Sequence, residues 1–91
     1  MNERELRAFV LAAQIGRMDV VAKALGYSQP AISYQIRCLE QSLGIKLFVR
    51  DSVGVRLTRE GQMLLPSARA LLLLMENIKT SVDHPPRAVG V

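Results

Sequence analysis

The sequence predicts a mainly α-helical fold that carries one β-hairpin. Apolar residues recur at helical spacing in four segments, a glycine follows each of the first three, and two short β-prone segments separate the third helix from the fourth. The chain has 91 residues, which suits one domain; 49% are hydrophobic and only 4% aromatic. We therefore expect one small domain with an aliphatic core.

The first helix is predicted from Glu3 to Ile15. Asn2 is its expected N-cap, and Glu5 stands where a capping box places its acidic member. Gly16 supplies the left-handed residue that ends a helix. The apolar face is expected to comprise Leu6, Phe9, Val10 and Ala13.

A second, short helix is predicted from Val20 to Leu25, with Asp19 as its N-cap and Gly26 as its end. A turn of only Tyr27 and Ser28 separates it from the next helix. Its inward-facing residues are expected to be Val21, Ala24 and Leu25.

The third helix is predicted from Gln29 to Leu43, because Ser28 can cap it, Pro30 suits its first turn and Gly44 can end it. Its apolar stripe comprises Ile32, Ile36, Leu39 and Leu43. The opposite stripe comprises Pro30, Tyr34, Arg37 and Gln41, with Ser33 on the flank. A polar outer stripe is normal for any surface helix. This one, however, carries no acidic residue, and its side chains can read DNA base edges.

The hairpin is predicted from Ile45–Arg50 and Val55–Thr58, around a turn that contains Gly54. Arg50 and Arg56 lie near its tip. Two strands alone are barely stable. We therefore expect the hairpin to pack on the helices through Leu47, Phe48 and Leu57.

A long helix is predicted from Arg59 to about Val82, with Thr58 as its cap and with Pro66 expected to cause a kink or an irregular first turn. Its apolar surface is wider than the single apolar stripe of a coiled-coil helix. Its length of about 36 Å exceeds what the small domain formed by the preceding residues can cover. We expect it to pack on its own domain and on a second subunit; the alternative is that it folds back only on its own core. The candidate dimer residues are Leu64, Ala68, Leu71, Leu72, Met75, Ile78 and Val82.

The basic charge fits a nucleic-acid partner but does not decide the function by itself; the predicted recognition helix is what favours DNA. The net charge is +4, the pI is about 9.8, and most basic residues are arginine; ordinary surface charge is the bland alternative. The single cysteine, Cys38, excludes an internal disulfide and a cysteine-based zinc site, and we expect a structural thiol rather than a redox sensor. His84 has no evident partner, so we expect no enzyme, catalytic residue, metal or cofactor. We also expect no signal peptide or membrane span, and a cytoplasmic, nucleoid-associated location.

The run Ala24–Ser33 resembles the DNA-binding region of LysR-type transcriptional regulators. The resemblance covers about residues 3–82 and continues through Leu39-Glu40, Leu43-Gly44, Leu47-Phe48 and Leu57-Thr58. It implies a winged helix-turn-helix head, residues 1–58, and a linker helix, residues 59–82, that dimerises antiparallel. Residues 83–91 would lead to an effector-binding domain beyond this chain. The small-molecule effector would act only through that domain, and any tetramer would need it.

The resemblance also implies roles for single positions. Double-stranded operator DNA, an interrupted inverted repeat, would be the partner. Base-facing positions would be Gln29, Pro30, Ser33 and Tyr34. Phosphate and wing positions would be Arg37, Thr58 and Arg50, to which the sequence adds Ser28 at the helix N-terminus and Arg56 near the hairpin tip.

Three departures from the family pattern affect these expectations. Tyr34 stands where many members have arginine, so the bidentate guanine contact is missing. Val53 stands where a basic residue is common, which leaves minor-groove insertion to Arg50 or Arg56. Arg17-Met18-Asp19 replaces a small, serine-containing approach to the second helix.

Two other readings remain open at this point. One is a protein-interaction module built on the apolar helix 59–82. The other is a winged-helix regulator of the molybdate-responsive kind, whose head is similar. The Ser-Gln-Pro-Ala run at 28–31 and the length of the last helix favour the LysR type.

Overall fold

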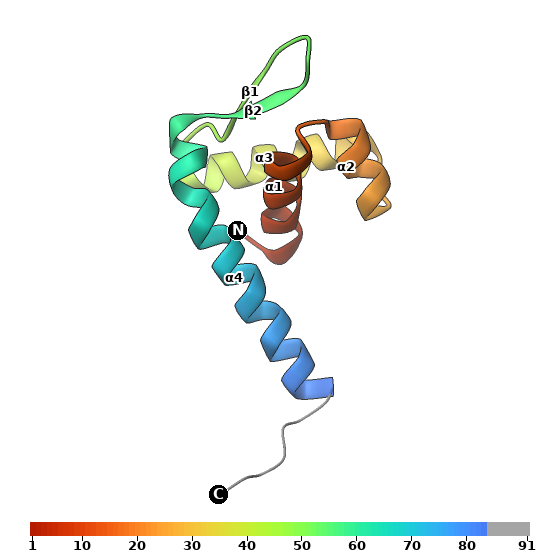
Figure 1. Ribbon diagram of the computed structural model, residues 1–91, viewed down its shortest axis with the longest axis vertical. Helices are drawn as coiled ribbons and strands as arrows, with labels where there is room; N and C mark the ends of the chain where they lie inside the picture. The colour runs from red at the N-terminus through yellow and green to blue at the C-terminus, as the bar shows by residue number, and fades with distance from the viewer. Residues whose placement is uncertain (84–91) are drawn as a thin grey trace, which may run out of the picture.

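The computed structural model describes residues 1–83 and contains, over that range, four helices and one hairpin (Figure 1). The expectations for His84 and for the tail that follows lie outside the described residues. In chain order the elements are α1 (Glu3–Ile15), α2 (Met18–Leu25), α3 (Gln29–Leu43), β1 (Phe48–Arg50), β2 (Val55–Leu57) and α4 (Arg59–Asp83).

Local capping signals fix most helix ends where the sequence predicts them. The Asn2 side chain accepts from the Glu5 amide at 2.8 Å, and the Ser28 hydroxyl accepts from the Ala31 amide at 3.2 Å. The Glu5 carboxylate accepts in return from the side-chain amide of Asn2. The glycine after each of α1, α2 and α3 is left-handed, with φ of 70–78°. α4 continues through Pro66 without a break.

The prediction for the start of α2 is wrong. The helix begins at Met18, its N-cap is Arg17 without a side-chain hydrogen bond, and Asp19 lies inside the first turn. Burial of Met18 in the core draws that residue into the helix. Asp19 still stabilises the helix N-terminus by its charge and pairs with Arg17 at 3.0 Å.

Two inward-facing assignments are also wrong. Ala24 is exposed, and its place in the core is taken by Ala22. Leu43 is 39% exposed, because it lies in the last turn of α3, beyond the elements that cover Leu39.

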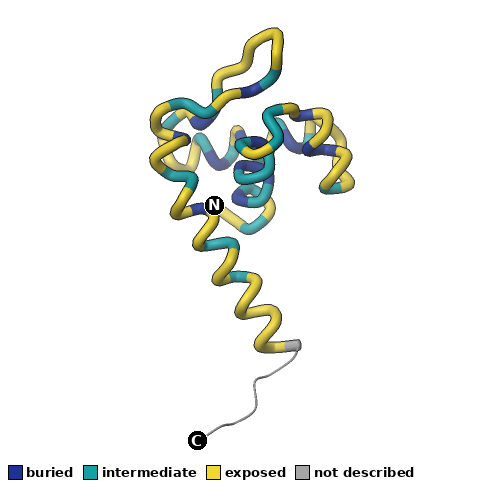
Figure 2. The backbone as a smooth tube through the Cα atoms, in the orientation of Figure 1, coloured by how far each residue is buried: buried dark blue, intermediate teal, exposed yellow. Residues whose placement is uncertain are grey.

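The core consists of two apolar clusters, both of which include residues of α1 and α3. Figure 2 marks the buried positions of the chain in dark blue. One cluster joins α1, α2 and α3 and includes Val55 of β2. The other joins α1, α3, Leu47 and the first half of α4. Phe9 and Phe48 pack edge to face, with ring centroids 5.7 Å apart, and so fasten the hairpin to the helices.

The hairpin packs on the helices as predicted. Its strands are antiparallel, and Arg50 pairs with Val55 in register. Leu47 is fully buried, while Phe48 and Leu57 pack against the second cluster. Thr58 caps α4 as expected: its hydroxyl oxygen accepts from the Gly61 amide at 3.0 Å.

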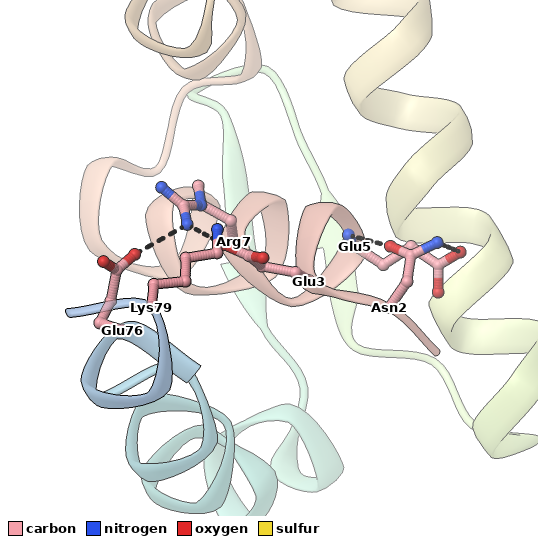
Figure 3. A network of polar contacts seen from close by, with 6 residues as sticks. All are labelled: Asn2, Glu3, Glu5, Arg7, Glu76 and Lys79. Atoms are coloured by element: carbon pink, nitrogen blue, oxygen red, sulfur yellow. Dashed lines mark hydrogen bonds and ion pairs between the residues drawn. The ribbon is translucent and has the colours of Figure 1, made fainter. Parts of the chain in front are cut away.

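α4 divides into a part that packs on the head and a part that extends away from it (Figure 1). A polar network fixes the last third of α4 to the start of α1 (Figure 3). Lys79 donates to the Glu3 carboxylate at 2.7 Å, and Arg7 bridges Glu3 and Glu76. Within residues 1–83, no helix is both long and apolar enough to cross a membrane.

Candidate nucleic-acid interface

The outer stripe of α3 is presented to solvent. Gln29, Pro30, Tyr34 and Arg37 are exposed, and Tyr34 is 63% exposed. Ser33 is partly buried on the side that faces the hairpin. Ser28 is exposed at the N-terminus of the helix, where the helix dipole favours an anion.

Two predicted contact residues from distant elements meet in the structure. The Arg50 guanidinium, on β1, donates a hydrogen bond of 2.8 Å to the Ser33 hydroxyl of α3. The arginine is therefore held over the exposed helix by a neutral partner. Sequence spacing alone could not predict this pairing, because it depends on where the hairpin packs.

The hairpin tip is shaped by Asp51. Its carboxylate accepts from the backbone amides of Val53 and Gly54, at 2.9 and 3.1 Å, and pairs with Arg56 at 2.9 Å. These backbone hydrogen bonds, with the charge of Arg56, lower the pKa of Asp51. Val53 is 86% exposed at the tip. Arg56 is thus partly neutralised, while Arg50 keeps its full charge.

Thr58 has a structural role in this geometry. Its hydroxyl accepts from Gly61 and donates to the Lys46 carbonyl at 2.6 Å, so its proton is already used. Its backbone amide also donates to the Leu47 carbonyl. Thr58 therefore joins the loop before β1 to the start of α4.

Tyr34 and Cys38 lie one turn apart on α3. The Cys38 side chain, through hydrogen bonding and then through its charge, raises the pKa of Tyr34 above its ordinary value. The phenol, which any tyrosine keeps protonated at neutral pH, can donate a hydrogen bond. Cys38 is a partly buried free thiol, as expected. Residues 1–83 contain no group of three or more side chains that could hold a metal ion.

Two polar residues beside this surface, Glu40 and Lys46, were not predicted as functional residues from the sequence. Glu40, on α3, accepts from the backbone amides of Leu47 and Phe48 at 2.8 and 3.4 Å, and so ties the helix to the hairpin. Lys46 lines a pocket of about 210 Å³ between α3 and the hairpin, together with Arg37 and Arg50. The only sequence signal for Lys46 was its positive charge just before β1.

The predicted dimer residues fall into two groups. Ala68 is buried in the chain's own core, because the head covers this side of α4. Leu64, Leu71, Leu72 and Met75 are partly buried against the same cluster. Ile78 and Val82, near the end of α4, are 65% and 75% exposed. Further apolar side chains of α4 are exposed: Met63, Leu73 and Leu74.

Known proteins match this chain over most of its length. A family model described as "Bacterial regulatory helix-turn-helix protein, lysR family" matches residues 4–62. The chain is 46% identical over 84 residues to the HTH-type transcriptional regulator TfdS of Cupriavidus pinatubonensis, covering 92% of this chain and 28% of TfdS. It is 44% identical over 79 residues to the Hca operon transcriptional activator HcaR of Escherichia coli, covering 87% of this chain and 27% of HcaR.

Solved structures of similar proteins also superpose on most of this chain. The crystal structure of a CbnR_DBD–DNA complex superposes with a TM-score of 0.84 at 36% identity, covering 91% of this chain and 95% of that one. A Corynebacterium glutamicum OxyR mutant gives a TM-score of 0.87 at 32% identity, covering 90% of this chain and 26% of that one. The chain therefore spans little more than a quarter of the length of these curated relatives.

Proposed function

Because the chain belongs to the lysR family of bacterial regulatory helix-turn-helix proteins, we propose that it binds double-stranded DNA in a sequence-specific way and regulates transcription. In this proposal α3 enters the major groove, where Gln29, Pro30, Ser33 and Tyr34 face base edges. The hairpin lies toward the adjacent minor groove, and Ser28, Arg37 and Arg50 contact phosphates. Its action on DNA would be at the nucleoid, in the cytoplasm.

The observation that carries this proposal is the surface of α3. It presents hydrogen-bonding side chains without an acidic residue, beside a hairpin whose Arg50 is directed toward the same helix. The structural likeness to a CbnR_DBD–DNA complex supports DNA binding by this chain. Gln29 suits adenine, and a protonated Tyr34 suits an acceptor or a thymine methyl group.

We also propose that the chain acts as a dimer through α4. One head reads only a short site, so two heads on one DNA face would give the specificity that a regulator needs. The exposed Leu74, Ile78 and Val82 supply apolar surface beyond the head. The site would be an interrupted inverted repeat, with half-sites one helical turn or a multiple of it apart, about 34 Å per turn. A small-molecule effector would act through a further domain.

The test is a selection from fluorescent duplexes that carry random interrupted palindromes, followed by titration at several salt concentrations. We expect a recovered dyad and a steep fall of affinity with salt. Gln29→Ala should relax the base preference, Arg37→Ala should lower the salt slope, and Arg69→Ala on α4 is the matched control. If the protein does not bind DNA at low salt, the proposal is wrong, and the α4 surface as a protein-interaction module becomes the better explanation.

A further inference from the structure

We propose that the pocket between α3 and the hairpin binds one phosphodiester group of the DNA backbone, and that Lys46 forms this site with Arg37 and Arg50. This inference rests on the proposed function and adds to it a residue and a site for one phosphate. The pocket has a volume of about 210 Å³, and its apolar walls include Ile36 and Phe48.

The charge of the pocket fits one anion. Within residues 1–83, neither Arg37, Lys46 nor Arg50 has an acidic partner within 4.0 Å, whereas Arg17 and Arg56 do. Arg50 donates instead to the neutral Ser33 hydroxyl. A cation held by a neutral partner keeps its charge for a ligand.

Glu40 is the acidic residue that lines the pocket. One of its oxygens already accepts from the amides of Leu47 and Phe48. These two N–H dipoles offset part of its charge and hold the backbone next to Lys46 in place. The side chains around the pocket therefore still carry two net positive charges.

The pocket continues at both ends, and this favours a polyanion over a free phosphate ion. Toward the hairpin turn, a second hollow shares Arg50 and Val55 with it. Toward Gly44, a third hollow shares Arg37, Lys46 and the hydrogen-bonded Glu40 with it. A helix in the major groove and a hairpin at the minor groove are separated by one sugar–phosphate strand. The groove between α3 and the hairpin is where that strand would pass.

The test uses the duplex recovered by the selection above. Lys46→Ala should lower the steepness of log affinity against log salt by about 0.9 per head, so for each bound head a fourfold rise in salt costs the variant about 3.5-fold less affinity than the wild type. Lys46→Arg should restore the slope, and Arg69→Ala, which lines none of the three hollows, should not change it. The base preference should be the same in all variants.

A scan of the same duplex with single uncharged methylphosphonate linkages locates the site. We expect one linkage per half-site at which the uncharged group lowers the affinity of the wild type. At that linkage, it should not lower the affinity of Lys46→Ala below the value for the unmodified duplex. If the wild type binds its dyad but Lys46→Ala keeps the wild-type slope and the same linkage sensitivity, the pocket proposal is wrong and the proposed function stands. If the wild type binds no duplex at low salt, both are wrong. Urea unfolding of each variant shows that the fold is retained.

Discussion

Gly61 lies where the first turn of α4 crosses the chain just before β1. A Cβ atom at this position would lie 2.4 Å from the Leu47 carbonyl oxygen and 2.9 Å from a methyl group of Leu57. Glycine is normally the weaker helix former, by about 1 kcal/mol relative to alanine. Here the backbone carbonyl cannot move without shifting Leu47, which is fully buried.

We therefore expect Gly61→Ala to lower the free energy of unfolding by about 1–3 kcal/mol, the usual cost of overpacking. Urea unfolding measures it. Ser67→Ala, at an exposed position of the same helix, should be nearly neutral. A stabilised Gly61→Ala variant would mean that the helix start does not pack as closely as the structure indicates.

Glu40 acts through backbone groups rather than through another side chain. Glu40→Ala would leave the amides of Leu47 and Phe48 without their acceptor in a partly buried place. Such a loss should cost about 1–3 kcal/mol of unfolding free energy. Glu40→Gln keeps an accepting oxygen and should recover part of the loss, while Gln41→Ala on the exposed side should change little. Equal stability of Glu40→Ala and the wild type would contradict this role.

At the scale of elements, α4 is joined to α1 by charge as well as by apolar packing. The Lys79 hydrogen bond, followed by the bond to Arg7, lowers the pKa of Glu3 below its ordinary value of 4.5 (Figure 3). A lowered pKa means that the link stabilises the fold above pH 4.5. Its contribution is lost as the pH falls through the lower, folded-state pKa.

We expect Lys79→Ala to raise the pKa of Glu3 toward 4.5, because the first of its two cationic partners is removed. An NMR titration of the Glu3 side-chain carbonyl measures it directly. Arg69→Ala removes an equal charge from the same helix and should leave this pKa unchanged. An unchanged pKa in Lys79→Ala would show that the α1–α4 link does not form in solution.

The elements that sequence predicts well here are those set by local chemistry. The bounds of α1 and α3 follow from Asn2, Ser28 and the glycines, because caps and left-handed residues act on their own backbone. The start of α2 was missed because burial of Met18 outweighs the capping preference of Asp19.

Predictions that depend on tertiary packing were less complete. The periodicity of α4 identifies an apolar surface but not what covers it, so Ala68 was assigned to a partner although the head buries it. The Ser33–Arg50 hydrogen bond and the Glu40 contacts join segments 7 to 17 residues apart. They arise only after the hairpin has packed through Leu47 and Phe48.

The whole molecule is longer than a compact chain of its size. Its radius of gyration is 15.3 Å and its longest dimension 56 Å, whereas a compact domain of this length has a radius near 12 Å. The excess comes from α4, whose last turns extend away from the head and are largely exposed (Figure 2). Ile78 and Val82 are among the exposed residues. Exposed apolar side chains along an extended helix are typical of an interaction surface, as the proposed dimer requires.

This shape predicts how one charge should affect assembly. Ile78→Glu places a carboxylate on the exposed apolar side of α4 without touching the head core, so the proposed dimer should dissociate while the fold remains. Thr80→Glu adds the same charge two residues away, on the opposite side of the helix, and should leave the dimer intact. Sedimentation equilibrium measures the mass, and far-UV circular dichroism checks the helices. Because one head reads only a short site, Ile78→Glu should also bind single half-sites like the wild type but lose the preference for the full dyad. A monomeric wild type, or a dimer unaffected by Ile78→Glu, would contradict dimerisation through this side of α4.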